Sequence, residues 1–142
     1  MPKASSEIVI NRPREDVFVF LADPENDAEW RSGVLELRHV SGSGIGARYA
    51  QGVKGPGGRR IPADIEITEL SPGELIAFQT VAGPVRPRGR YVLAAADGGT
   101  RVRFELEADV KGVKRLLAPM VQKTMNHEVR QLESLKRVIE TH

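Results

Sequence analysis

The feature that most constrains the fold is a change in the spacing of apolar residues along the chain. Between about residues 35 and 107, short runs alternate apolar and polar side chains and are separated by glycine-rich turns, which is typical of half-buried strands. After Gly112, apolar residues recur every three or four positions and predict a helix over 113–140. Because short turns join antiparallel strands, we expect an antiparallel sheet whose apolar face is covered by this long C-terminal helix.

Two short helices are expected between the first strand and the rest of the sheet. The first strand ends in the apolar run 8–10, and Asn11 is a candidate N-cap for the helix that follows it. Asp23 followed by Pro24 predicts a second short helix that runs to about Trp30, because aspartate caps helices and proline is tolerated at their first position. The predicted fold is therefore α+β, with about seven strands in the curved sheet.

The last hairpin predicts its own register. If Asp97 and Gly98 are the two loop residues, Tyr91 faces Phe104 on the apolar side. Each arginine on the other side then faces an acid, in the pairs Arg90–Glu105, Arg88–Glu107 and Arg86–Asp109. A register shifted by two residues pairs Arg90 with Glu107 and Arg88 with Asp109 instead. Both registers place an acid opposite Arg88 and Arg90, so we expect no clustered basic face of a nucleic-acid-binding protein at this hairpin.

The C-terminal helix carries one apolar stripe, and Pro119 should bend it or separate its first turn and a half. The stripe consists of Leu117, Val121, Met125, Leu132, Leu135 and Ile139. One narrow stripe cannot fill the concave side of a curved sheet. The architecture therefore predicts an internal cavity between the sheet and this helix.

Length and charge place the chain among ordinary globular proteins. A length of 142 residues predicts a single domain, 1–142, that can bury a core without disulfides. Lys and Arg number 21 and Asp and Glu 19, a formal charge of +2. Neither a signal peptide nor an apolar run of membrane-spanning length is present, so we expect a cytoplasmic protein without stable membrane insertion.

Several kinds of site are excluded by residue type and spacing. The chain has no cysteine, which excludes a disulfide scaffold, a zinc ribbon, an iron–sulfur site and a cysteine nucleophile. The three histidines do not form a pair at metal-ligand spacing, so we expect neither a metal nor another cofactor. The glycine run 42–46 precedes a strand and not a helix, so it is a turn and not a nucleotide-binding loop.

Several sequence segments resemble the SRPBCC superfamily, the START-like group of polyketide cyclase/dehydrase type. The segments are IVINRPREDVF (8–18), LADPEN (21–26), Trp30, IEITELSPG (65–73), GGTRV (98–102), LLAP (116–119) and LESLK (132–136). The resemblance covers nearly the whole chain and implies a helix-grip fold, in which the sheet wraps around the C-terminal helix. These segments are caps, turns and core positions, so they indicate the fold more strongly than an activity.

The resemblance and the strand parity together predict a pocket that is mainly apolar with a few hydroxyls and amides, as in small-molecule sites. We expect its lining to be Trp30, His39, Tyr49, Gln51, Ile65, Phe78, Thr80, Tyr91, Phe104, Met120 and Thr124. The alternative is that these side chains fill the space between sheet and helix completely. His39 shares the parity of Leu35 and Leu37, so it either points inward or is a hydrogen-bonded residue at the strand end. Trp30 either closes the mouth of the cavity or belongs to the core.

Three functions are compatible with this pattern. The first is binding of a hydrophobic or amphipathic small molecule, such as a lipid, a polyketide or an aromatic compound. The second is a cyclase, aromatase or dehydratase, which needs an acid or base in the pocket; the candidates are His39, Tyr49, Tyr91 and Glu128. Glu128 either edges the cavity or is half-exposed beside Val129, and the pattern favours exposure. The third is a co-chaperone-like interaction module. We expect no nucleic-acid partner, and a monomer or homodimer.

Overall fold

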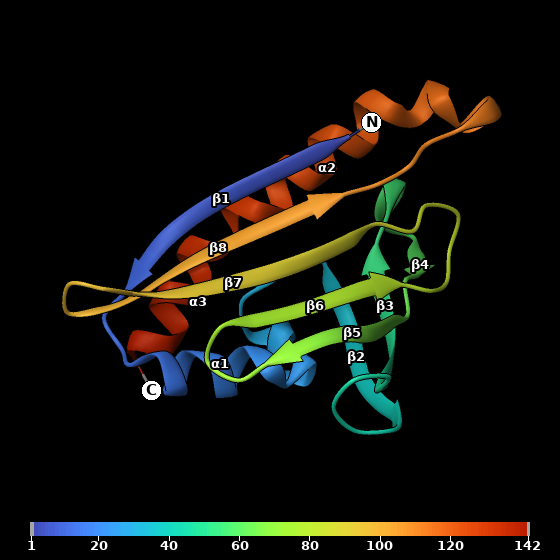
Figure 1. The fold of residues 1–142 in the computed structure, drawn as a ribbon. Coiled ribbons are helices and arrows are strands. Elements are labelled where there is room, and N and C mark those ends of the chain that lie inside the picture. The colour runs from blue at the N-terminus through green and yellow to red at the C-terminus, as the bar shows by residue number, and fades with distance from the viewer. Residues whose placement is uncertain (1, 142) are drawn as a thin grey trace.

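The computed structural model describes residues 2–141, apart from the side chains of residues 56, 113 and 114. Over these residues eight strands form one antiparallel sheet in the order β1-β8-β7-β6-β5-β3-β2, with β4 paired to β3 (Figure 1). The strands are β1 (Lys3–Ile10), β2 (Val34–Ser41), β3 (Arg48–Lys54), β4 (Arg60–Pro62), β5 (Ile65–Ser71), β6 (Leu75–Thr80), β7 (Arg88–Ala96) and β8 (Gly99–Glu107).

Helical segments connect the strands and follow the last one. They are α1 (Arg14–Ala22), η1 (Pro24–Glu29), η2 (Pro56–Gly58), η3 (Gly112–Leu117), α2 (Ala118–Arg130) and α3 (Leu132–Glu140). Both α2 and α3 pack on β1, and α2 also packs on β8, so the C-terminal segment runs along one face of the sheet (Figure 1). We call this face the inner face and the opposite one the outer face. The expected antiparallel sheet covered by a C-terminal helical segment is confirmed.

The predicted register of the last hairpin is also confirmed. Tyr91 pairs with Phe104, and Arg90 and Arg88 pair with their predicted acids. The ladder ends at Arg88, so the predicted pair Arg86–Asp109 does not form, and the Asp109 carboxylate accepts a hydrogen bond of 3.4 Å from Arg88 Nη1 instead. Gly98 takes a φ of 76° in the two-residue loop, a conformation that favours glycine.

The alternating segment 61–68 is not one strand, because the chain leaves the ladder between β4 and β5. Proline at position 62 has no N–H to continue the pairing. The Ala63 N–H donates to the Gln51 carbonyl at 2.8 Å, and Asp64 Oδ1 accepts from the Gln51 N–H at 3.2 Å. Residues 63 and 64, which separate β4 from β5, therefore bond both the carbonyl and the N–H of Gln51.

The two N-terminal helices differ in how they begin. Asn11 does not cap α1: Pro13 is the N-cap residue and makes no side-chain capping bond. The Asn11 N–H donates to Glu140 Oε2 at 2.8 Å, which ties the end of β1 to the end of α3. The predicted cap at Asp23 is confirmed, because its carboxylate accepts from the Glu25 N–H at 3.1 Å.

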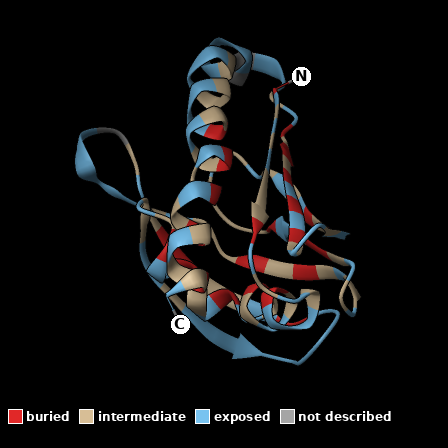
Figure 2. Ribbon diagram, turned by 90° about the vertical axis from the view of Figure 1, so that its left-hand side faces the viewer, coloured by how far each residue is buried: buried red, intermediate tan, exposed pale blue. Residues whose placement is uncertain are grey.

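The C-terminal segment is divided twice. Pro119 lies in the first turn of α2 and separates it from η3, as predicted. A second break at Gln131 was not predicted; its N–H donates to the Glu128 carbonyl at 3.1 Å. The stripe residues of α3 and the second half of α2 are buried, whereas Leu117 is 38% exposed, because η3 and the first turns of α2 extend beyond the end of the sheet (Figures 1 and 2).

The core lies between the inner face and the helical segments. Strands β6, β7 and β8 contribute alternate side chains, and the helices complete the cluster from the other side. The largest side chains exposed by less than 2% are Phe104, Ile10, Leu21, Ile76, Leu132, Leu135, Val17, Val102 and Thr100. Figure 2 shows buried residues recurring along the strands and on the sheet-facing side of the helix.

Candidate functional site

Four aromatic side chains meet on the inner face. Tyr91 and Phe104 are paired across β7 and β8, with ring centroids 4.5 Å apart. Trp30, which follows η1, lies edge-on to both rings at 6.2 Å. Phe78 of β6 lies 5.9 Å from Tyr91 and is only partly buried. These rings form a continuous aromatic wall that faces the helical layer.

Space for the Phe78 ring is provided by Gly89. The two residues are register partners on β6 and β7. A Cβ atom at position 89 would lie 2.7 Å from Phe78 Cζ and 2.6 Å from Leu106 Cδ2, closer than real Cβ contacts. The bare glycine therefore lets the ring lie flat against the sheet.

An ion cluster lies beside the aromatic wall and joins η1, β3 and α2. Arg31 Nη1 donates to Asp27 Oδ2 at 3.1 Å and to Gln51 Oε1 at 3.0 Å, and Arg31 Nε donates to Glu128. The side chains of Arg31, Asp27 and Glu128 are 14%, 7% and 18% exposed. Gln51 Nε2 donates to the Ala63 carbonyl at 2.8 Å, which fixes the amide orientation. We refer to Asp27, Arg31, Gln51 and Glu128 as the ion cluster.

Burial and mutual charge set the protonation of this region. Burial raises the pKa of Asp27 from 3.8 to about 6, although Arg31 opposes the shift. Burial lowers the pKa of Arg31, but the carboxylates of Glu128 and Asp27 outweigh it and the pKa rises. Burial, with the Asp27 charge, raises the pKa of Tyr91 well above 10, so its phenol stays protonated. Two carboxyls share one guanidinium, and one of them changes protonation near pH 6.

Two buried polar atoms of this region have no hydrogen-bond partner among the described residues: Asp27 Oδ1 and Trp30 Nε1. The Trp30 indole N–H and the Asp27 carboxylate do not form a hydrogen bond of normal geometry. The indole is nevertheless close enough to lower the pKa of Asp27. An unpaired buried donor beside an unpaired buried acceptor is uncommon in folded proteins. A hydroxyl group, which both accepts and donates, would satisfy both atoms.

The residues predicted to line the pocket fall into three groups. Six are buried: Trp30, Gln51, Ile65, Thr80, Tyr91 and Phe104. Tyr49 and Phe78 are partly buried. The other three are exposed: His39, Met120 and Thr124. Met120 and Thr124 on α2 are thus more exposed than the rings of the aromatic wall.

His39 does not point into the core, which corrects the inward alternative. It is exposed near the end of the sheet-edge strand β2, where its register partner is Tyr49. Its Nε2 lies 2.5 Å from the Gly42 carbonyl, and its ring lies 5.2 Å from that of Tyr49. Of the two alternatives, the hydrogen-bonded residue at the strand end is the one observed.

Glu128 was expected to be exposed, and this was wrong: it is mostly buried against Arg31. Sequence reasoning also missed Asp27 and Arg31 as site residues. A signal existed, because these two stand four residues apart with opposite charge, the spacing of a helical ion pair. That spacing is common on solvated helices, so the sequence did not distinguish a buried pair from an exposed one.

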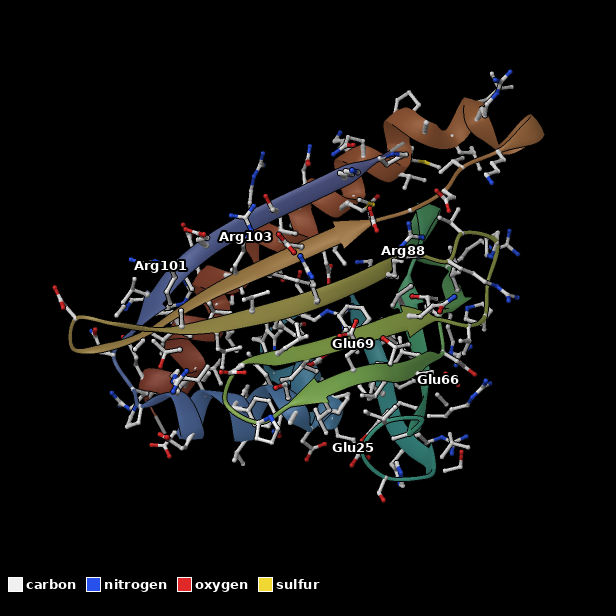
Figure 3. All side chains as sticks on the ribbon, in the orientation of Figure 1. Glu25, Glu66, Glu69, Arg88, Arg101 and Arg103 are labelled. Atoms are coloured by element: carbon white, nitrogen blue, oxygen red, sulfur yellow. The ribbon has the colours of Figure 1, made fainter. Side chains whose placement is uncertain are left out.

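Over the described residues two hollows are present, and neither is lined by the inner-face rings of Tyr91 and Phe104. One of about 660 Å³ crosses the outer face over β1, β8, β7, β6 and β5, and its lining includes Arg88, Arg90, Arg103, Glu69 and Glu105. Figure 3 labels several charged side chains of these strands. Of the predicted lining residues, only Phe78 contributes to this hollow. The second, of about 290 Å³, lies between η1 and α3 and reaches Trp30 and Arg31.

The described residues contain neither a metal-ligand cluster nor a membrane-spanning helix. No group of three histidine or acidic side chains there is placed to hold a metal ion. No described helix combines the length and the apolar character needed to cross a membrane.

The comparison with protein families decides the relationship. A family described as polyketide cyclase/dehydrase and lipid transport matches residues 1–140. The chain belongs to this polyketide cyclase/dehydrase and lipid transport family. The predicted SRPBCC, START-like relationship is thereby confirmed. No curated protein matches the chain.

Solved structures show how widely the fold of this polyketide cyclase/dehydrase family member is shared. The protein TTHA0849 from Thermus thermophilus superposes with a TM-score of 0.84 at 23% identity, over 99% of this chain and 98% of that one. A START superfamily protein from Mycobacterium smegmatis gives 0.77 at 16%, over 98% and 97%. The di-domain ARO/CYC protein BexL of the BE-7585A biosynthetic pathway gives 0.79 at 19%, over 99% of this chain and 47% of that one. At these identities the likeness establishes the helix-grip fold alone.

Proposed function

We propose that this protein binds a hydrophobic or amphipathic small molecule between the inner face and the C-terminal helical segment. The observation that carries the proposal is the aromatic wall of Trp30, Phe78, Tyr91 and Phe104 next to the ion cluster. Such sites combine apolar and aromatic lining with a few placed polar groups. The family description, which includes lipid transport, supports the same class of ligand.

The gradient of burial supports an entrance at the first turns of α2. Trp30 and Tyr91 are 3% exposed, whereas Met120 is 48% exposed. A ligand entering past Met120 and Thr124 would leave water progressively as it approached the aromatic wall. Each square ångström of apolar surface that it buries contributes roughly 25 cal/mol.

Charge in the ion cluster selects the polar group of the ligand. Arg31 already faces the carboxylates of Asp27 and Glu128, so a third carboxylate would be repelled. A hydroxyl or carbonyl carries no such penalty. A neutral polar group next to a hydrocarbon or aromatic body is therefore the chemistry that fits, as in a polyketide, a sterol-like alcohol or a phenol.

The test is native mass spectrometry of the purified protein followed by denaturing extraction of bound compounds. We expect a copurified apolar compound, or a thermal shift with neutral lipids and phenols that exceeds the shift with fatty-acid anions. An empty protein without thermal shift from either group contradicts the proposal.

Two variants locate the bound molecule. Tyr91→Leu changes the aromatic wall and should abolish the thermal shift, whereas Arg90→Gln on the outer face should leave it unchanged. The reverse result would move the ligand to the outer hollow.

A second candidate is acid–base catalysis on a ketone-containing substrate, and the Asp27 carboxyl favours it. A group with a pKa of about 6 can both take and return a proton near neutral pH. In a dehydration, the carboxylate would remove the proton beside a carbonyl and the resulting carboxyl would protonate the departing hydroxyl, which leaves as water. Turnover of a β-hydroxy ketone that rises through pH 6 and is lost in Asp27→Asn would support this function; turnover unaffected by that change would contradict it.

A further inference from the structure

The segment from η3 to the first half of α2 has a charge unlike that of the rest of the chain. Residues 110–127 contain four cations and no acid, in a chain whose formal charge is only +2. The cations are Lys111, Lys114, Arg115 and Lys123. In the part of the chain that the structure describes, no salt bridge involves Lys111, Arg115 or Lys123. Their charge is therefore available to a partner.

The same segment exposes large apolar side chains. Leu116 is 87% exposed, Leu117 38% and Met120 48%. Single exposed apolar residues are normal, but three within one turn and a half of chain form a local patch. We call Leu116, Leu117 and Met120 together with Lys111, Arg115 and Lys123 the basic–apolar tip.

Strand register shows that other basic loops lie toward this end of the sheet. Gln79, Arg88, Glu107 and Lys3 are successive register partners across β6, β7, β8 and β1. The β6–β7 connection and the exit of β8 toward η3 therefore leave the sheet at the same end. The β3–β4 connection, which contains three cations and no acid over residues 54–60, lies toward this end as well (Figure 1).

We propose that the basic–apolar tip docks this protein reversibly on an anionic lipid surface. Exposed leucines beside unpaired cations are the combination by which interfacial segments bind membranes, because the apolar side chains enter the headgroup boundary and the cations face anionic lipids. A nucleic acid would use the cations but leaves Leu116 and Leu117 in water. The docking does not depend on the proposed ligand, although it would direct the entrance proposed near Met120 toward the membrane.

The experiment is co-sedimentation of the full chain with vesicles of phosphatidylcholine alone or of equal parts phosphatidylcholine and phosphatidylglycerol. We expect binding to the anionic vesicles only, and weaker binding as salt is raised. Absence of binding to anionic vesicles at low salt, or equal binding to both vesicle types, overturns the proposal.

Two variants separate the apolar from the charged contribution. Leu116→Ser with Leu117→Ser should weaken binding at least about tenfold. Its matched control is Val19→Ser on α1, which removes a 69% exposed apolar side chain from another element. Charge variants Lys111→Gln, Arg115→Gln and Lys123→Gln should each weaken binding about fivefold, whereas Arg38→Gln, Arg101→Gln and Arg130→Gln should not.

Three results would assign the tip to another occupant and overturn the proposal. The first is vesicle binding that survives the leucine changes. The second is DNA binding that falls with the charge variants but not with the leucine variant, without vesicle binding. The third is a concentration-dependent dimer that Leu116→Ser and Leu117→Ser dissociate, again without vesicle binding. A matching melting temperature of each variant shows that the fold is kept.

Discussion

The two faces of the sheet use the same ionic chemistry in opposite surroundings. On the inner face, Arg31 is 14% exposed and its partners are similarly buried, so the ions have lost most of their water. On the outer face, Arg90 is 55% exposed beside Glu105. Exposed pairs contribute little because water and salt screen them, whereas removing one member of a buried pair leaves an uncompensated charge. Loss of a cation should therefore cost more folding free energy at Arg31 on the inner face than at Arg90 on the outer face.

The largest expected effect follows from removing the inner guanidinium. Arg31→Met keeps the side-chain volume but leaves Asp27 and Glu128 facing each other without a cation. We expect the free energy of unfolding to fall by about 3–5 kcal/mol at pH 7 in urea titrations. Arg90→Met is the outer-face control and should cost less than about 1 kcal/mol. Equal losses in the two variants would contradict the comparison.

Asp27→Asn tests whether burial of the inner ion cluster makes the free energy of unfolding depend on pH. The folded state holds the Asp27 proton up to about pH 6 and the unfolded state only to about 3.8, so the folded state binds more protons between these values. The stabilisation by this group is full below pH 3.8 and is lost as pH rises through 6. Urea titrations from pH 4 to pH 7.5 should show the wild type losing about 2–3 kcal/mol relative to the variant. Parallel pH profiles would contradict the assignment.

Packing on the inner face is tested at Gly89. Gly89→Ala places a methyl group against Phe78 and Leu106, and we expect a loss of about 1–3 kcal/mol from overpacking. Gly33→Ala is the control, because nothing lies within 4 Å of the new methyl group. Urea titration of both variants measures the difference. A neutral Gly89→Ala would mean that the Phe78 ring moves aside freely.

The smallest effect is expected from the outer face itself. Arg90→Gln removes a cation that shares Glu105 with Arg103, so one ion pair of this carboxylate remains. The change in the free energy of unfolding should be about 0.2–1 kcal/mol and should disappear in high salt. A double-mutant cycle of Arg90→Gln with Glu105→Gln measures the coupling energy. A coupling energy that does not change with salt would contradict the prediction that this pair is screened.

Local patterns in the sequence predicted much of the fold. The two-residue loop at Asp97 and Gly98 set the register of the last hairpin, and Pro119 set the break before α2. These features depend on neighbours within a few residues, where backbone geometry and missing donors act directly. The predicted Asn11 cap is wrong because α1 begins only at Arg14, after the N-cap residue Pro13. The Asn11 N–H instead bonds Glu140, 129 residues away.

The candidate site depends on long-range proximity, and the sequence predicted less of it. Parity along β7 and β8 placed Tyr91 opposite Phe104, as observed. It could not place Arg31 against Glu128, because those residues are 97 positions apart and lie on different elements. Parity also did not predict the exposure of His39, which lies near the end of the edge strand β2. The predicted lining of the pocket remains a prediction for the ligand experiments.

The joining of the first strand to the last helices constrains the order in which a growing chain can fold. Strand β1 pairs only with β8 in the sheet order and is packed against α2 and α3, so its partners are synthesised about a hundred residues later. Lys136 Nζ donates to the Val9 carbonyl at 2.8 Å, which closes that arrangement. During synthesis, the first strand therefore stays unpaired until β8 leaves the ribosome. Until then the growing chain carries an unpaired strand, which favours aggregation.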